Sequence, residues 1–137
     1  MPSFIPVSLL VPYQVSGGTT QLFMQTRVED GPLNGLLEFA GGKIEHNETP
    51  EAAAMREFCE EVEVITGTCH QFKMYKHDYN DRSVCLFVNI MRVEDKDFCK
   101  GSWVDLPETF HEDDWVKRVP DANIEIIKDL TNYLFQN

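Results

Sequence analysis

Residues 42–64 read GKIEHNETPEAAAMREFCEEVEV, and this stretch carries most of what the sequence reveals about the fold. It holds a glycine, a glutamate six residues later, an Arg-Glu pair eight residues further on and, after two more residues, a second pair of acids. These positions are Gly42, Glu48, Arg56, Glu57, Glu60 and Glu61.

A helix is signalled inside this stretch. Thr49 suits the N-cap position and Pro50 suits the first helical position. Residues 51–55 are good helix formers, so the helix is predicted to run to about Val62.

Three carboxylates share this predicted helix. Glu57 and Glu61 are four residues apart and lie on one face, with Glu60 beside them. Such carboxylates repel each other unless a cation neutralises them, and hard oxygen ligands suit Mg²⁺ or Mn²⁺ rather than zinc. Arg56 can form an ion pair with Glu48 that fixes the preceding loop against the helix. Without a metal, the same residues would form a solvated acidic face, as most charge runs do.

The spacing resembles the Nudix box, G-x5-E-x7-R-E-U-x-E-E-x-G-U, where U is a bulky apolar residue. Beyond the box, the chain is similar to MutT-type Nudix hydrolases over nearly its whole length. LEFAGGKIE at 37–45 resembles their L-E-F-P-G-G-K-I-E, YNDR at 79–82 their F-P-D-R, and VPDAN at 119–123 their P-P-A-N. Ala40 replaces the usual Pro. Glu63 replaces a box glycine, which implies a strained residue costing roughly 1 kcal/mol or a turn of another shape.

The resemblance implies a hydrolase that cleaves phosphoanhydride bonds with Mg²⁺, for which Mn²⁺ substitutes. It places the metal on the carbonyl oxygen of Gly41 and the carboxylates of Glu57, Glu60 and Glu61. Glu48 and Arg56 join the catalytic set. For the general base it implies Asp97, with Glu94 and Asp95 as nearby substitutes and Glu60 as the alternative.

Five residues are implied as substrate contacts by the same resemblance: Arg27, Glu38, Lys43, Tyr79 and Asn123. Asn123 would read a purine base, since an amide can pair with two groups on its edge. The alternatives are an N-cap for Asn123, a surface residue for Arg27 and an exposed hairpin aromatic for Tyr79.

The implied reaction converts a nucleoside triphosphate to its monophosphate and pyrophosphate, and an oxidised purine such as 8-oxo-dGTP is one candidate. An RNA 5′-pyrophosphohydrolase and a nucleotide-sugar hydrolase are alternatives within the family. The alternative from another class is a Nudix module that senses a nucleotide without hydrolysing it.

Composition and net charge indicate the number of domains, the partners and the location of the protein. The 137 residues predict one domain, 1–137, and the net charge of −11 argues against broad binding to nucleic acid or to an anionic membrane. No apolar run approaches transmembrane length, and the first residues lack the features of a signal peptide. The four cysteines lack CxxC spacing and predict reduced thiols in a cytoplasmic protein, with a disulfide or zinc site as the alternative. The sequence is compatible with a monomer and with a homodimer.

The order of predicted elements favours an α/β fold of the α+β kind. Strands are expected at 3–12, 20–27, 36–39, 65–77, 82–92 and 102–106, with a turn at 14–19. A second helix at 123–135 has an apolar stripe of Ile124, Ile127, Leu130 and Leu134. A mixed sheet with two main helices on opposite faces makes an α/β/α sandwich, as in Nudix domains.

Overall fold

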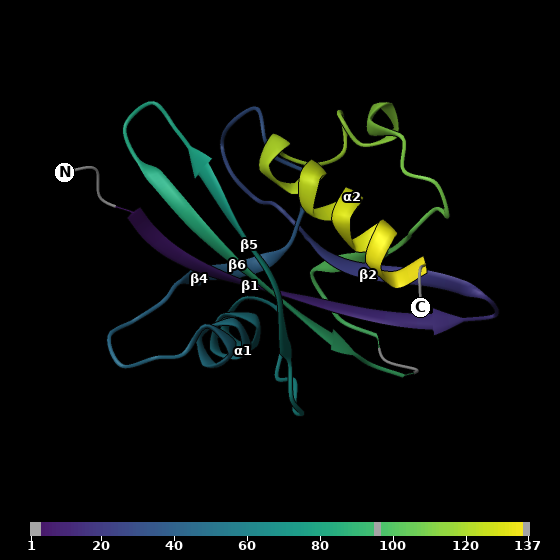
Figure 1. Cartoon of the computed structure of the whole chain (residues 1–137), viewed down its shortest axis with the longest axis horizontal. Coiled ribbons are helices and arrows are strands. Elements are labelled where there is room, and N and C mark those ends of the chain that lie inside the picture. The colour runs from purple at the N-terminus through teal and green to yellow at the C-terminus, as the bar shows by residue number, and fades with distance from the viewer. Residues whose placement is uncertain (1–3, 95–96, 136–137) are drawn as a thin grey trace.

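A mixed seven-stranded sheet forms the centre of the protein in a computed structural model that describes residues 4–94 and 97–135 (Figure 1). The elements follow in the order β1 (Phe4–Ser16), β2 (Thr19–Thr26), β3 (Leu37–Glu38), β4 (Ala40–Lys43), α1 (Pro50–Glu61), β5 (His70–Asp78), β6 (Ser83–Arg92), β7 (Gly101–Asp105), the 3₁₀ helix η1 (Glu112–Asp114) and α2 (Asp121–Phe135).

β1 is the strand around which the sheet is built. It pairs in parallel with β6, from Phe4 opposite Ser83 to Tyr13 opposite Arg92. It also pairs antiparallel with β4 over residues 7–10 and with β2 over residues 13–16. The main path of the sheet is β3-β2-β1-β6-β5, and β7 adds to β2.

Two hydrophobic cores cover the two faces of the sheet. Because successive side chains of a strand point to opposite faces, Leu10 and Phe23 pack with Phe58 of α1. Their neighbours in β1 and β2 pack in the other core with Ile127 and Leu130 of α2. Figure 1 shows α1 below the sheet and α2 above it. The predicted α/β/α sandwich with a mixed sheet and two main helices is confirmed.

The second helix matches its predicted stripe. Ile124, Ile127 and Leu130 are buried, and Leu134 packs half-buried at the edge of the same core. The helix begins at Asp121, two residues before the predicted start. No helix among the described residues has the length and apolar character needed to cross a membrane.

The first hairpin is tighter than predicted. Gly17 and Gly18 have φ of 58° and 82°, and two consecutive residues with positive φ join antiparallel strands with the correct twist. β1 therefore continues to Ser16, and the predicted turn at 14–19 is wrong at its edges. The predicted first strand began at residue 3, which lies outside the described residues.

Two further boundaries differ from the sequence-based expectation. β4 was not predicted, because glycines are disfavoured in strands, yet it pairs with β1. A Cβ on Gly41 would lie 2.2 Å from the carbonyl oxygen of Ser8, so this close pairing requires a glycine. β5 begins at His70 rather than 65, since the chain first turns through Gly67 with φ of 123°.

Candidate active site

Helix α1 is fixed at its start by both local and long-range hydrogen bonds. As predicted, Thr49 is the N-cap, and its Oγ1 accepts from the backbone N–H of Ala52 at 3.1 Å. The hydroxyl of Ser8 donates to the carbonyl of Pro50 at 2.5 Å, and Nδ2 of buried Asn89 donates to the same hydroxyl at 2.8 Å. The first turn of α1 is thereby tied to β1 and β6.

The guanidinium of Arg56 holds the loop before α1 against the helix. Its Nε and Nη2 donate to the two carboxylate oxygens of Glu48 at 2.6 and 2.9 Å, which confirms the predicted ion pair. Nη2 also donates to the carbonyl of Lys43 at 3.1 Å. Hydrogen bonding to Arg56 lowers the pKa of Glu48 to about 2, so this carboxylate stays charged at neutral pH.

The same guanidinium contacts two of the three helix carboxylates. Nη1 of Arg56 lies 2.9 Å from Oε1 of Glu57 and 3.4 Å from Oε2 of Glu60. Glu57 packs against Gly42, where a Cβ would lie only 2.4 Å from its carboxylate carbon. Glu60 is the most open of the three, with 60% of its side chain exposed.

The third carboxylate turns into the protein. Oε2 of half-buried Glu61 accepts from the backbone N–H of Gly41 at 3.2 Å. Burial raises the pKa of Glu61 to about 7, and the charges of Glu57 and Glu38 act in the same direction. Hydrogen bonds from Gly41 and Gln25 oppose this shift. The site therefore concentrates negative charge that a cation would relieve.

The side chains lie apart rather than in a closed ligand cage. Across residues 4–94 and 97–135, no three His, Cys, Asp or Glu side chains form a group that could hold one metal ion. The guanidinium of Arg56 instead contacts the carboxylates of Glu57 and Glu60, while the carboxylate of Glu61 accepts from the N–H of Gly41. The chemistry of the donors still fits a hard divalent cation, since carboxylate and carbonyl oxygens are its preferred ligands.

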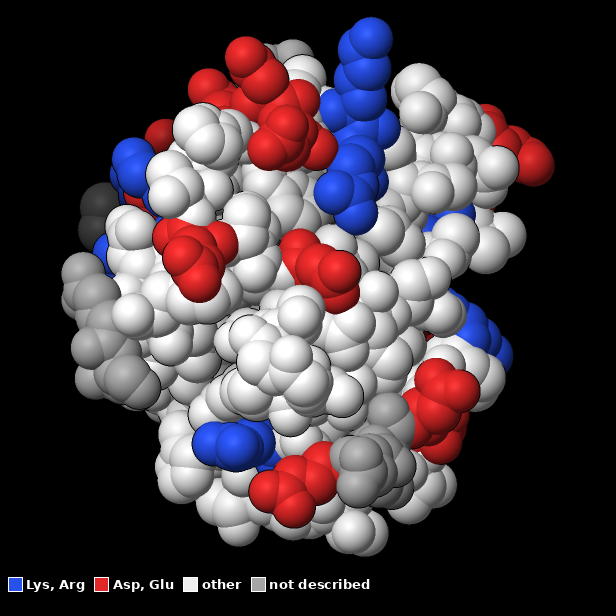
Figure 2. All heavy atoms as spheres, turned by 90° about the vertical axis from the view of Figure 1, so that its right-hand side faces the viewer, with Lys and Arg blue, Asp and Glu red and all other residues white. Residues whose placement is uncertain are grey.

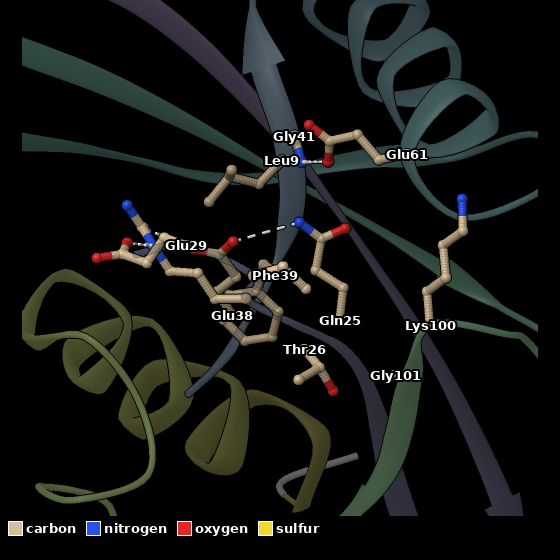
Figure 3. Close-up of a pocket in the computed structure, with 12 residues that line it drawn as sticks. Leu9, Gln25, Thr26, Glu29, Glu38, Phe39, Gly41, Glu61, Lys100 and Gly101 are labelled. Atoms are coloured by element: carbon tan, nitrogen blue, oxygen red, sulfur yellow. Dashed lines mark hydrogen bonds and ion pairs between the residues drawn. The ribbon is translucent and has the colours of Figure 1, made fainter. Parts of the chain in front are cut away.

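A cavity of about 780 Å³ opens beside Glu61 (Figure 3). Its walls come from strands β1 to β4, the loop after β2, the end of α1 and the start of β7. The lining residues outside that loop are Leu9, Gln25, Thr26, Glu38, Phe39, Gly41, Glu61, Lys100 and Gly101. The loop contributes Arg27, Val28 and Glu29. This volume is typical of a small-molecule site.

Arg27 lies in the cavity between two carboxylates. Its Nε contacts Oε1 of Glu29 at 2.5 Å, and its Nη1 contacts Oε2 of Glu38 at 3.0 Å. Hydrogen bonding to Glu29 raises the pKa of Arg27, with Glu38 acting in the same direction. Gln25 donates to the other oxygen of Glu38 at 3.3 Å. Arg27 and Glu38 thus lie where a substrate could reach them, as the sequence suggested.

The other predicted substrate residues lie outside the cavity lining. Asn123 is within α2 and not its N-cap; its Oδ1 accepts at 3.3 Å from the N–H of Phe39, which does line the cavity. Tyr79, at the β5–β6 turn, stacks edge-on against His77 with ring centroids 4.5 Å apart. Lys43 is exposed at the end of β4, where its carbonyl binds Arg56.

The predicted candidates for the general base that the structure describes also lie outside the cavity lining. Asp97 is exposed, and its Oδ1 accepts from the N–H of Phe98 at 3.1 Å. Glu94 is exposed as well, and Asp95 lies outside the described residues. Of the predicted catalytic residues, Glu61 alone lines the cavity.

Glu63 adopts the second of the two shapes expected at the end of α1. Only Asn47 and Lys100 have positive φ among the described non-glycine residues, so the backbone at Glu63 is not left-handed. Its N–H donates to the carbonyl of Phe58 at 3.2 Å, and its Oε1 accepts from the N–H of Cys99 at 2.8 Å. The chain therefore turns here without a left-handed residue, and the carboxylate of Glu63 links α1 to the segment before β7.

Sequence reasoning missed several lining residues, chiefly Gln25, Thr26, Glu29, Lys100 and Gly101. Gln25 shares a strand face with Arg27, since alternate residues point the same way, and this period was available in the sequence. Lys100 and Gly101 reach the cavity only because β7 pairs with β2, opposite Gln25. No local signal in the sequence announces that pairing.

Known proteins are similar to this chain in sequence and in fold. A family model described as NUDIX domain matches residues 7–121. The 8-oxo-dGTP diphosphatase of Escherichia coli (strain K12) is 35% identical over 91 residues, covering 63% of this chain and 70% of that protein. The 8-oxo-dGTP diphosphatase of Proteus vulgaris is 38% identical over 65 residues, covering 47% of this chain but only 58% of that relative. The MutT protein from Methanosarcina mazei Go1 shares the fold, with a TM-score of 0.74 at 17% identity over 99% of this chain and 98% of that one.

Proposed function

Because this chain belongs to the NUDIX family, we propose that it is a metal-dependent pyrophosphohydrolase that cleaves a nucleoside triphosphate to the monophosphate and pyrophosphate. The observation that carries this proposal is the cavity, which joins Glu61 and Gly41 beside α1 to Arg27 and Glu38 at the ends of β2 and β3. The relatives named 8-oxo-dGTP diphosphatase support an oxidised purine triphosphate as the first substrate to test.

We assign Mg²⁺ as the metal, with Mn²⁺ as a substitute. The carboxylates of Glu57, Glu60 and Glu61 and the carbonyl oxygen of Gly41 would hold it, because all four offer hard oxygen donors. When bound, the cation would stabilise charge on the phosphate oxygens and activate water.

Arg56 acts as a positioning residue in this proposal. It contacts Glu57 and Glu60, and Glu48 fixes its guanidinium from the other side. The proton of the attacking water is assigned to Glu60 in preference to Asp97. Glu60 lies on α1 beside Glu57 and Glu61, which would hold the metal, whereas Asp97 lies on the segment before β7 and accepts from the N–H of Phe98.

The end of the cavity away from Glu61 would bind the nucleoside. Arg27 and Glu38 offer a donor and an acceptor there, and each already contacts the other. Asn123 would donate from Nδ2 to an oxo group of the purine while its Oδ1 accepts from Phe39. Roles for Tyr79 and Lys43 remain predictions, since neither lines the cavity.

The setting of the reaction is also part of the proposal. We expect residues 1–137 to form one domain that acts on free nucleotides, without stable binding to nucleic acid or membranes, as a monomer or homodimer. The net charge of −11 supports this, as do the small, separate groups of basic side chains on the face in Figure 2. A cytoplasmic location is supported by the four cysteines, which are free thiols.

The test is metal-dependent release of pyrophosphate from dGTP, 8-oxo-dGTP, ATP, triphosphorylated short RNA and nucleotide sugars. Strong release from a purine triphosphate with Mg²⁺, abolished by Glu57→Gln, is the expected result. Turnover of RNA ends or nucleotide sugars instead would keep the chemistry and overturn the substrate. Binding of nucleotide without any turnover would favour the sensing module.

A further inference from the structure

One basic side chain in the cavity has no carboxylate partner. Arg27 is held by Glu29 and Glu38, but no ion pair within 4.0 Å joins Lys100 to any carboxylate of residues 4–94 and 97–135. In Figure 3 the Lys100 side chain extends from the start of β7 toward the end of the cavity that holds Glu61. An unpaired ammonium group therefore faces the part of the site next to the helix carboxylates.

The backbone of Lys100 is held in an unusual conformation. Its φ of 63° is left-handed, a region that favours glycine over lysine. Its carbonyl accepts from the N–H of Thr26 at 2.9 Å. The next residue, Gly101, has no space for a side chain, since a Cβ would lie 2.3 Å from the carbonyl oxygen of Met24. β2 thus fixes where the Lys100 side chain leaves the backbone.

A second anchor ties the same segment to α1. The N–H of Cys99 donates to Oε1 of Glu63 at 2.8 Å, and its thiol donates to the carbonyl of Val62 at 3.2 Å. Glu63 stands where the box pattern has a glycine, which could not supply this carboxylate. Glu63, the residue that departs from the box pattern, therefore supports the segment that carries Lys100.

The cavity is lined by more acidic than basic side chains, so a negatively charged substrate needs an unpaired cation there. Glu29, Glu38 and Glu61 all line it, and Arg27 is already engaged by the first two. A polyphosphate entering this site would meet uncompensated negative charge even with a metal bound. A flexible ammonium group with three donors can follow phosphate oxygens as a point charge.

We propose that Lys100 binds the phosphate chain of the nucleotide substrate, and that Glu63 is a positioning residue that holds the Lys100 segment through Cys99. This inference rests on the proposed function, because it concerns the same substrate and the same cavity.

The experiment compares Lys100→Ala, Lys100→Arg and Lys100→Gly with the wild type, using exposed Lys117→Ala, outside the cavity, as the matched control. The alanine variant should lower kcat/KM for the triphosphate about tenfold, mainly through KM, as expected for a lost charged hydrogen bond. The arginine variant should recover most of this loss, and Lys117→Ala should behave as wild type.

Lys100→Gly separates binding from folding. Glycine relieves the left-handed backbone, so its melting temperature should equal or exceed that of the wild type, while kcat/KM falls as in Lys100→Ala. A merely structural lysine would make activity follow stability. If Lys100→Ala does not fold, this variant alone decides the question.

The role of Glu63 is tested by a double-mutant cycle. Glu63→Ala should reduce kcat/KM by about threefold, a part of the effect of Lys100→Ala, and should add little when both changes are combined. Glu63→Gln keeps an acceptor for Cys99 and should be nearly neutral. Full additivity of the two alanine changes would overturn the positioning role.

The failures of the two proposals are distinguishable. If the wild type turns over nucleotide and Lys100→Ala has an unchanged KM, the role of Lys100 is wrong and the proposed function stands. If the wild type releases no pyrophosphate from any nucleotide, calorimetric binding of 8-oxo-dGTP with Mg²⁺ replaces turnover. Equal affinity of wild type and Lys100→Ala, or no binding by either, would then overturn the inference.

Discussion

Gly42 leaves the space that the carboxylate of Glu57 occupies, since a Cβ on this glycine would lie 2.4 Å from the carboxylate carbon. Gly42 does not have a positive φ, so its backbone accepts alanine. Gly42→Ala should therefore displace Glu57 and lower kcat about tenfold or more, with little change in melting temperature. Steady-state kinetics and thermal unfolding on one preparation measure both.

The control for Gly42→Ala should show the reverse behaviour. Gly18 has open space around it but a φ of 82°. Gly18→Ala should destabilise the hairpin by about 1 kcal/mol and leave the turnover of the folded protein unchanged. Full activity of Gly42→Ala would show that Glu57 is not needed where it lies.

The Glu48–Arg56 ion pair should make stability depend on pH in the acid range. The pKa of Glu48 is lowered to about 2, below its usual 4.5, so its contribution is present above pH 4.5 and lost as the pH falls toward 2. The difference in unfolding free energy between wild type and Glu48→Gln should therefore shrink from pH 6 to pH 2.5. Urea unfolding at both pH values measures it; a constant difference would contradict the ion pair.

Removing Arg27 should weaken substrate binding rather than the chemical step. Arg27→Ala takes the cation from between Glu29 and Glu38, so two carboxylates would face the nucleotide without compensation. We expect KM for the triphosphate to rise about tenfold, with kcat changed less. Exposed Arg92→Ala, outside this cavity, is the matched control. An unchanged KM would place the nucleotide elsewhere.

The buried hydroxyl of Ser8 should matter for stability. Ser8→Ala removes the hydroxyl that donates to the carbonyl of Pro50 and one of the three acceptors of Asn89 Nδ2, which keeps the carbonyls of Leu9 and Phe87. Losing these hydrogen bonds should cost about 1 kcal/mol, seen as a lower melting temperature and an earlier urea midpoint. Val11 offers a contrast to Ser8. Val11→Ala should destabilise the sheet by lost packing without affecting the start of α1. Comparing protection of the amides of α1 from hydrogen exchange in the two variants separates the effects.

Local signals predicted the parts of the site that depend on adjacent residues. Thr49 and Pro50 identified the start of α1, and the spacing of Glu48 and Arg56 identified their ion pair. The start of α1 follows from capping, and the ion pair joins residues only eight apart, so both features are short-range. The apolar stripe of α2 was predictable for the same reason.

The remaining parts depend on which strands become neighbours. Lys100 reaches the cavity because β7 pairs with β2, and Glu63 finds its partner in Cys99, 36 residues away. β4 was missed since its glycines read as a loop, although they permit the close approach to β1. Long-range pairing of this kind leaves no pattern in a short window of sequence.

The parallel pairing of β1 with β6 also sets the order of events during synthesis. Ser8 and its partner Asn89 are 81 residues apart, so at ribosomal speed the first strand waits roughly 4–16 s for its neighbour. Throughout this interval the face of β1 that α2 covers stays open, because α2 follows β6 in the chain, and this exposes the nascent chain to association and to chaperones. The segment 42–64 thus emerges complete well before the scaffold that orients it can assemble.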